Sequence, residues 1–585
     1  MSNELPPRAL PEGHTPVSRE ELSSEALDSE IDPAIPRAFG MFRDSAGEKR
    51  AVYARPIGSL PELLTAAQGR KDKESAVKTS FPGAERIVET FRQARVGLQL
   101  PSGKTIARRP HLVITGGFVR DALLGMVPKD IDFATNLTYE ETEQLLSDSF
   151  GTDIAEGRIR FQRTGEAFPV MRVKFEDGDE YELATFRKEE GATDGRHPDT
   201  IETIRYPGAD ADRRDFTVNA LFYNPLSGNV IDYVGGLRDI DDRTLRFVGD
   251  PAERIEEDHL RMLRYLRFLQ KTGFSEDPQA RSAIRASAEQ VLRLPAERIT
   301  DELNRTFALG NVGNTLERLQ DYGLLEKLLP EVANLASCKQ GPPYHMEGDV
   351  FRHTVLVANG LPQSAGTELA WAAILHDIGK PETRSEEPAK DGSPAVHFLE
   401  HEHASVRDAR EILAPTDDSK KRFAFSGKSA ETIRNLIEKH IKIFSFADMR
   451  RGTAEAFLKE TRDYWDDLYA LAIADTRASH GSDPSLDANR MHNLERISER
   501  AQEIFAFWEQ AKDAINEITA LVNGNLIKER YAALHGIELT GRRQKIIGAI
   551  KNAAQAKIRE ERILDPDTAR ETLDAVIATF PPDAS

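Results

Sequence analysis

Asp130 and Asp132 stand two residues apart in the string DIDFAT, whose composition favours a β-strand. Side chains two positions apart on a strand project from the same face of the sheet. Paired carboxylates on one face can hold two Mg²⁺ ions, which activate an attacking hydroxyl and stabilise a leaving pyrophosphate. The pair is therefore the first candidate for metal-dependent chemistry.

A glycine pair, Gly116 and Gly117, closes the apolar run HLVITGG shortly before these acids, and the helical string FVRDALLGM follows it. At such a junction between a strand and a helix, backbone amides can approach a phosphate and the helix dipole favours an anion. Arg120, one turn into the helix, can reach the same phosphates. Each motif alone commonly marks an ordinary turn or strand end. In this order, together with the acids, they predict a nucleotide-binding site.

A second set of candidate ligands lies in helical surroundings in the C-terminal half: His353, His376, Asp377, His401, His440 and Asp475. Imidazole and carboxylate groups suit a transition metal or Mg²⁺ that lowers the pKa of a bound water. A lone buried histidine is more often structural, whereas the adjacent pair in HDIGK favours a metal site. His403 competes with His401 for one position, and the string FLEHE favours His401.

The elements that must position these residues predict an α+β protein. Strand-like and helical strings alternate between residues 96 and 240, which predicts a small mixed sheet with helices. Beyond Pro251 the pattern is helical almost to the end, apart from a loop-like segment from Pro381 to Val396. At 585 residues the chain is too long for one core. We expect a partly disordered N-terminal extension (1–95), a head that contains the sheet (96–240) and three helical regions (241–335, 336–484 and 485–585).

The composition narrows the functional classes. Cys338 is the single cysteine and excludes an intrachain disulfide, a thiolate zinc site and an iron–sulfur cluster. No apolar run approaches the roughly 18 residues that span a bilayer, and the N-terminus is polar, so we expect no membrane partner and a cytoplasmic location. The net charge of −19 argues against indiscriminate binding of polyanions. Any RNA must therefore bind a local basic surface.

The string GGFVRDALLGMVPKDIDFAT resembles the signature of the class II nucleotidyltransferases, the family of bacterial and eukaryotic CCA-adding enzymes and bacterial poly(A) polymerases. Three further strings follow in the family's order, up to Arg305: RRDFTVNALFYNP, EDHLRMLRYLRF and PAERITDELNR. The resemblance implies a template-independent RNA nucleotidyltransferase whose head is followed by a helical neck at residues 241–335.

The resemblance also implies roles for individual residues. Contacts with Mg²⁺ or with the nucleotide triphosphate are implied for the paired acids, the glycine turn and two arginines: Asp130, Asp132, Gly116, Gly117, Arg120 and Arg214. In the family an Asp and an Arg of the third string act as a protein template for the base of CTP or ATP, which implies Asp258 and Arg261. The third string is expected to form one helix, on which Asp258, Arg261, Arg264 and Arg267 follow one another at steps of three residues. Arg264 and Arg267 are therefore also expected to contact the nucleotide. Glu182, in YELATF, is a third carboxylate or a structural residue.

The histidine-rich half resembles the HD superfamily of metal-dependent phosphohydrolases, whose ligand pattern is H…HD…H…H…D. The pattern is complete between His353 and Asp475, which implies an HD domain at residues 336–484 that can bind a metal. Some bacterial CCA-adding enzymes carry such a domain, and in them it implies phosphatase and 2′,3′-cyclic phosphodiesterase activity. That chemistry would free a blocked RNA 3′ end for the transferase.

Three functions remain open at this point. The first is addition of CCA, or part of it, to the 3′ end of tRNA from CTP and ATP. The second is a bacterial poly(A) polymerase, although the string GRIRFQRTGEAFPVMRVKF is only mildly basic for that group. The third is an HD nucleotide phosphohydrolase with an inactive transferase head. The sequence leaves the oligomeric state and the HD metal open, and His197 stands where the family's flexible loop usually has an arginine.

Overall fold

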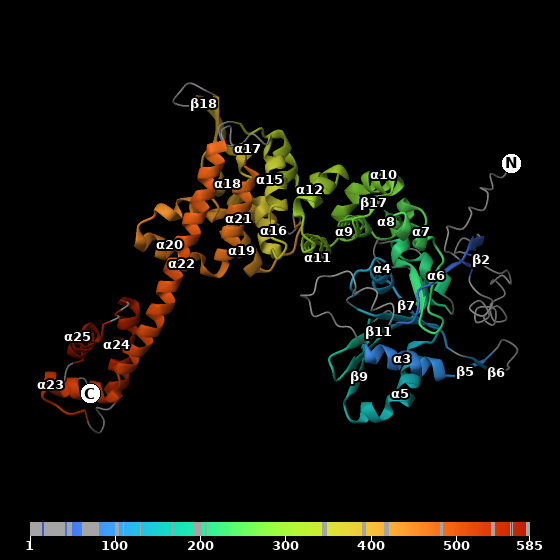
Figure 1. Ribbon diagram of the computed structural model, residues 1–585, viewed down its shortest axis with the longest axis horizontal. Coiled ribbons are helices and arrows are strands. Elements are labelled where there is room, and N and C mark those ends of the chain that lie inside the picture. Colours follow the sequence, from blue (N-terminus) through green and yellow to red (C-terminus); the bar gives the residue numbers. More distant parts are fainter. Residues whose placement is uncertain are drawn as a thin grey trace.

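The computed structural model shows an elongated protein with the head at one end and a small group of helices at the other (Figure 1). The described residues are 15–16, 41–43, 49–60, 81–99, 105–108, 110–128, 130–165, 168–190, 200–204, 207–341, 348–388, 394–414, 421–479, 484–539, 545–561, 563 and 565–580. The α+β organisation expected from the sequence is confirmed, with a mixed sheet in the head and helices through the rest of the chain.

A nine-stranded mixed sheet forms the centre of the head. Its strands are β1 (Thr15–Pro16), β4 (Tyr53–Pro56), β7 (Leu112–Thr115), β8 (Asp132–Thr135), β9 (Ile159–Thr164), β10 (Val170–Phe175), β11 (Glu180–Thr185), β14 (Leu221–Asn224) and β15 (Asn229–Asp232). The strand order is β1-β4-β15-β14-β7-β8-β11-β10-β9, and the pairing of β8 with β11 is the parallel one. That parallel register sets Glu182 opposite Asp132.

Both faces of this sheet are buried. In β7, Leu112 and Ile114 belong to one hydrophobic cluster and Val113 to another, because successive side chains of a strand point to opposite faces. Helices α3 (Pro82–Gln93) and α5 (Tyr139–Ala155) pack against each other, and α5 also packs on β9 and β10. The sheet is thereby held as a rigid support for the strand ends that carry the candidate site.

The head begins earlier in the chain than the boundary expected at residue 95. Strand β4 pairs with β15, and β1 pairs with β4 at the sheet edge. Ala54 is buried in the sheet, and Ile87 and Phe91 of α3 are fully buried. The sequence did not indicate this strand because a short strand rich in polar residues is defined by its partner, and that partner lies about 170 residues away.

The neck consists of short helices with well-defined ends. These are α8 (Pro251–Glu257), α9 (Arg261–Thr272), α10 (Pro278–Ser287), α11 (Ala296–Phe307), α12 (Val312–Asp321), α13 (Leu325–Leu328) and α14 (Pro330–Ala333). Asp250 caps α8, and Gly273 ends α9 in the left-handed conformation. The prediction that Asp258 shares one helix with Arg261 is wrong: Asp258 ends α8 with an extended backbone, and α9 begins at Arg261.

The histidine-rich region packs on the neck as a second helical body. Its helices are α15 (Val350–Asn359), α16 (Thr367–Leu375), α17 (Lys380–Thr383), α18 (His401–Leu413), α19 (Gly427–Lys439), α20 (Arg451–Thr461) and α21 (Trp465–Ala478). Trp371 of α16 donates to Asn304 of α11 at 2.7 Å, which joins the two bodies. Strands β18 (Arg384–Pro388) and β19 (Pro394–Phe398) form a hairpin where a loop was predicted. Among the described strands these two pair only with each other. The string is rich in Pro and Glu, which do not favour strands, so the hairpin could not be recognised from the sequence.

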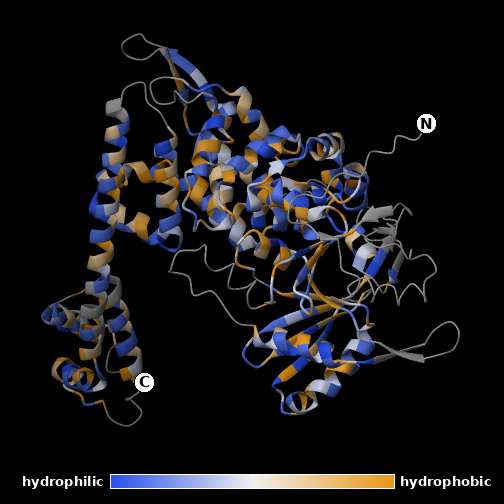
Figure 2. Ribbon diagram, turned by 45° about the vertical axis from the view of Figure 1, so that its right-hand side comes forward, coloured by the Kyte–Doolittle hydropathy of each residue, from blue (hydrophilic) through white to orange (hydrophobic). Residues whose placement is uncertain are grey.

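A 38-residue helix, α22 (Pro484–Leu521), leads from this body to the tail helices α23 (Gly524–His535), α24 (Lys545–Glu561) and α25 (Pro566–Ala578). The tail has its own hydrophobic core, separate from the one that runs through head, neck and histidine-rich region. Figure 2 shows the tail as a distinct group of helices at the end of α22. Among the described residues, no helix is both long and apolar enough to cross a membrane.

Candidate functional site

The glycine turn lies where three predicted site residues meet. Gly116 follows β7 with φ +73° and forms the N-cap of α4 (Gly117–Leu123). A Cβ atom at this position would lie 3.7 Å from Arg214 Nη1 and 3.9 Å from Asp132 Oδ2. A Cβ atom at Gly117 would lie 3.5 Å from Arg120 Nη2. The turn therefore borders a carboxylate on one side and two guanidinium groups on the others.

The acids beside the turn form a cluster that repels itself. Asp132 begins β8, whereas Asp130 precedes the strand, so the prediction that both lie on a strand is half right. Burial, together with the neighbouring charges of Glu182 and Asp130, raises the pKa of Asp132 to about 6, while Arg214 opposes the shift. Glu182 also accepts from Arg172 at 2.6 Å. A divalent cation would relieve this repulsion, so the donor set fits Mg²⁺.

A cavity of about 430 Å³ opens between the head and the neck next to this turn. It is lined by Gly116, Gly117, Arg120, Arg213, Arg214, Asp215, Asn219, Asp258, Arg261, Arg264, Arg267, Phe268 and Lys271. Seven of these residues are Lys or Arg and two are Asp, in a chain whose net charge is −19. The local basic surface that an anionic ligand requires is therefore present.

Buried acids fix the arginines of this cavity. Asp215 accepts from Arg264 Nε at 3.0 Å, and Glu302 accepts from Arg267. Burial alone would raise the pKa of Asp215, but the charge of Arg264 outweighs it and holds the pKa below its ordinary value. Phe268 lies beneath both guanidinium groups, 5.7 Å and 4.6 Å from them. The cations are thus oriented before any ligand arrives.

Asp258 and Arg261 reach the cavity from the junction of α8 and α9. Asp258 accepts from Arg298 at 3.2 Å and from the backbone amide of Leu260 at 3.1 Å. Arg261 donates to Glu257 at 2.6 Å and to the backbone carbonyl of Arg213 at 3.1 Å. A hydrogen-bond acceptor, Asp258, and a donor, Arg261, are therefore held at the same wall of the cavity. This pair suits a heterocyclic base whose edge offers an amino donor beside a ring-nitrogen acceptor.

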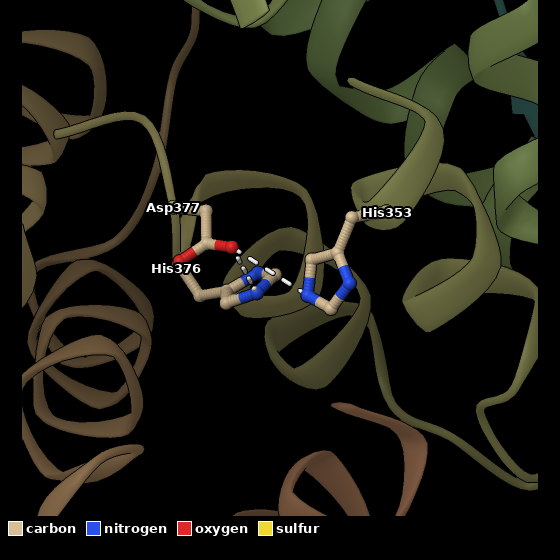
Figure 3. A group of neighbouring side chains, drawn as sticks. All are labelled: His353, His376 and Asp377. Carbon is tan, nitrogen blue, oxygen red and sulfur yellow. Dashed lines mark ion pairs between the residues drawn. The ribbon is translucent and has the colours of Figure 1, made fainter. Parts of the chain in front are cut away.

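The six predicted ligands of the C-terminal half converge in a second site, and all of them except Asp475 are buried. Figure 3 shows three of them, His353, His376 and Asp377. Asp377 is central. Its Oδ2 lies 3.1 Å from His376 Nε2 and 3.5 Å from His353 Nε2, and its Oδ1 lies 3.2 Å from His401 Nε2 and 4.0 Å from His440 Nε2. The sixth ligand, Asp475 of α21, lies 3.1 Å from His353 Nε2. The competing His403 is 66% exposed.

The backbone fixes which nitrogen of each imidazole faces this centre. Nδ1 of His376, His401 and His440 lies 2.9, 2.8 and 2.6 Å from the carbonyl oxygens of Ala373, Phe398 and Ile437. Because a carbonyl only accepts, each Nδ1 carries the proton and each Nε2 keeps a lone pair toward Asp377. This is the arrangement of histidines that bind a metal.

The electrostatics of the second site favour a neutral His440 and an anionic Asp377. Burial lowers the pKa of His440 to about 3, helped by the neighbouring charges of His376 and His401. Burial would raise the pKa of Asp377, but His376 and Lys380 outweigh it and hold the pKa well below the ordinary range. A neutral imidazole and an ionised carboxylate are the forms in which these two side chains bind a divalent metal.

Three family models match the chain. The "Poly A polymerase head domain" covers residues 112–246, the "Probable RNA and SrmB- binding site of polymerase A" covers residues 273–335, and the HD domain covers residues 350–479. The chain therefore carries the head, RNA-binding and HD domains that these models describe. In this chain the cavity lies between the matched head and the neck, and the buried histidines lie within the matched HD domain.

Curated relatives carry both names of the family. The CCA-adding enzyme of Bacillus licheniformis is 36% identical over 265 residues, which are 45% of this chain and 59% of the relative. Poly(A) polymerase I of Haemophilus influenzae is 34% identical over 238 residues, which are 38% of this chain and 48% of the relative. The chain thus spans about half the length of these relatives. The solved CCA-adding enzyme of Bacillus stearothermophilus in complex with CTP aligns with a TM-score of 0.49 at 20% identity, over 86% of this chain and 99% of that one.

Several residues of the two sites were not predicted from the sequence. Lys271 lines the nucleotide-site cavity, and Asp121 joins it to Arg120. In the HD domain Lys380 contacts Asp377 at 2.6 Å. Lys380 lies in the string HDIGK and could have been found there, whereas Lys271 follows no motif. The predicted loop around His197 lies outside the described residues.

Proposed function

We propose that this protein adds nucleotides to the 3′ end of RNA, and specifically adds CCA to tRNA from CTP and ATP. The proposal rests on one observation: a carboxylate cluster and a basic cavity meet at the glycine turn, where Asp132 and Arg214 both lie within 4 Å of the position of a Gly116 Cβ atom. Family relatives named CCA-adding enzymes support the choice of tRNA as substrate.

The cavity residues would bind the nucleotide at both of its ends. Arg120 and Arg214 border the turn and would hold the triphosphate by charge-assisted hydrogen bonds. Asp258 and Arg261 would pair with the edge of cytosine or adenine, since both bases place an amino group beside a ring nitrogen. Binding at both ends would orient the α-phosphate toward the 3′-hydroxyl of the RNA.

Asp130 and Asp132 would hold Mg²⁺, with Glu182 opposite Asp132 as a third carboxylate. When bound, Mg²⁺ supplies activation of the attacking hydroxyl and stabilisation of the leaving pyrophosphate. The new phosphodiester bond forms between the 3′-oxygen and the α-phosphorus as pyrophosphate leaves. The chain's own contribution is to keep the triphosphate and the carboxylates on adjoining sides of one turn.

The test is incubation of the protein with tRNA that lacks its CCA end, with labelled CTP and ATP supplied singly and together. We expect two C residues and then one A, without further extension. Long A tails from ATP alone would instead identify a poly(A) polymerase, the activity named for the Haemophilus relative. Absence of any addition would remove the transferase proposal.

A second function, metal-dependent phosphohydrolysis, is favoured by the geometry of the HD domain. The two carboxylate oxygens of Asp377 face different groups, His353 and His376 on one side and His401 and His440 on the other, and each group with Asp377 is close enough to hold one ion. Asp377 would serve both groups as a shared ligand, and a divalent metal held there would supply activation of a water molecule at neutral pH. A 2′,3′-cyclic phosphate or terminal phosphate at an RNA end is the expected substrate.

The chain offers a matched pair of variants for this second function. We expect His401→Ala to abolish hydrolysis of 2′,3′-cyclic nucleotides and to lower the bound metal from two ions to about one per chain, measured by elemental analysis. His403→Ala should change neither, because His403 is exposed and turned away. Equal metal content in both variants, or no hydrolysis by the metal-loaded wild type, would contradict the proposal.

A further inference from the structure

The cations that line the cavity between the head and the neck are not equally neutralised by carboxylates. Two of its arginines each face their own carboxylate: Arg264 pairs with Asp215 and Arg267 with Glu302, so both pairs are balanced in charge. Arg261 pairs with Glu257, which also pairs with Arg254 outside the cavity lining. An anionic ligand gains most from cations that are not already neutralised, so the remaining cations decide where its charge is bound.

Two further carboxylates are each shared by two cations that both line the cavity. Asp210 of α6 (Pro207–Asp212) is buried and pairs with Arg213 and Arg214, both at 2.8 Å. Asp121 of α4 is buried and pairs with Arg120 at 2.6 Å and with Lys271 at 2.8 Å. Each group carries one excess positive charge. The first contains Arg214, which borders Gly116, and the second contains Arg120, which borders Gly117.

Lys271 has the exposure and the hydrogen-bonding capacity of a ligand contact. Its side chain is 27% exposed, and it lines the cavity from the last turn of α9. Among the described residues Lys271 donates one hydrogen bond, to Asp121, so two of its three ammonium N–H groups can donate to a ligand. Burial and the nearby Arg120 lower the pKa of Lys271, an effect that a bound anion would oppose.

We propose that Lys271 is a further triphosphate-binding residue of the nucleotide site, and that Asp121 positions it together with Arg120. This inference rests on the proposed nucleotidyltransferase function. Because Lys271 belongs to the neck and Arg120 to the head, a triphosphate between them would bind both domains at once. The nucleotide would thereby fix the distance between its phosphate-binding turn and the wall that carries Asp258.

The test compares Lys271→Met with the wild type in steady-state addition of CTP and ATP to tRNA. We expect the KM for either nucleotide to rise about tenfold with kcat changed less than about threefold, as for a lost charge-assisted contact. Inhibition by inorganic triphosphate should weaken by the same factor, whereas inhibition by cytidine should not change. Lys271→Arg should restore most of the affinity for inorganic triphosphate.

Arg293→Met is the matched control, because Arg293 is an exposed neck cation outside the cavity and should alter none of these values. If Lys271→Met does not fold, Lys271→Gln replaces it with the same expectation, since Gln can still donate to Asp121. Unchanged affinity for inorganic triphosphate, or a loss confined to kcat, would overturn the assignment of Lys271. A wild type that binds inorganic triphosphate but adds no nucleotide would contradict the proposed function and leave the binding role of Lys271 to be decided by the competition experiment.

Discussion

Asp132 is held in a state that is unfavourable for the metal-free protein. Burial and the neighbouring acids raise its pKa to about 6, so its carboxylate is ionised at neutral pH at a cost in stability. Structural acids of the cavity show the opposite, since Asp215 pairs with Arg264 and has a lowered pKa. The difference separates an acid that needs a cation from outside the chain from one that the chain has already neutralised.

We expect Asp132→Asn to abolish nucleotide addition and to stabilise the metal-free protein at pH 8. Because the folded pKa lies above the ordinary 3.8, the contribution of Asp132 to stability is present below about pH 4 and is lost as the pH rises through 6. The gain of the variant should reach up to about 3 kcal/mol above pH 7 and vanish near pH 4. Denaturant unfolding at several pH values, with and without Mg²⁺, measures it. A gain that is independent of pH, or that Mg²⁺ does not reduce, would contradict this account.

At the scale of the elements, the turn between β7 and α4 positions the charged residues of the candidate site. Gly116 adopts φ +73°, which is strained for a residue with a side chain. Arg214 and Asp132 both lie within 4 Å of the position of its Cβ atom. The parallel pairing of β8 with β11 adds Glu182 to the same corner. The corner is therefore specified by one backbone conformation and one strand register, and not by the side chains alone.

Gly116→Ala should lower both stability and activity. At Gly116 the positive φ is combined with ψ −135°, a conformation nearly restricted to glycine that costs an L-residue about 1–3 kcal/mol. A shift that relieves this strain would move Arg214 and Asp132 apart. We expect kcat/KM for CTP addition to fall at least tenfold. Gly249→Ala is the matched control, because Gly249 has the same φ of +73° and open space around its Cβ position. It should lose similar stability with its activity kept. Equal activity in the two variants would show that the turn does not position the site.

At the scale of the whole molecule, the tail has a hydrophobic core of its own, which is reached through α22. A second cluster covers one face of the sheet in the head, and a third runs from the head through the neck into the HD domain. The two candidate sites therefore share a continuous support. We therefore expect the tail to unfold without disturbing either site, as separate cooperative units do.

Leu573→Ala tests this independence. Leu573 is fully buried in the tail core, and its truncation should destabilise the tail by about 2–5 kcal/mol. Hydrogen exchange should accelerate in residues 524–580, with exchange in the head and affinity for inorganic triphosphate unchanged. Leu534→Ala is the control, since Leu534 of the same tail is 49% exposed. Faster exchange at α9 or β8 would show that the tail supports the nucleotide site.

The sequence by itself predicted the α+β organisation, the order of the motifs and six candidate metal ligands, which the fold brings close together. These predictions follow from local spacing. A separation of two residues keeps Asp130 and Asp132 close together, and the adjacent pair His376 and Asp377 indicates a metal site whatever the surrounding fold. Local spacing persists in any fold that keeps the element, which is why these predictions needed no tertiary contact.

Only the tertiary structure decided what depends on residues distant in the chain. The pairing of β4 with β15, the end of a helix at Asp258 and the sharing of Asp121 between Arg120 and Lys271 each join segments that are separate in sequence or are set by long-range packing. Such contacts are selected by burial and charge compensation in the complete fold. No local pattern encodes them, and they determine which cations of the cavity remain available to a nucleotide.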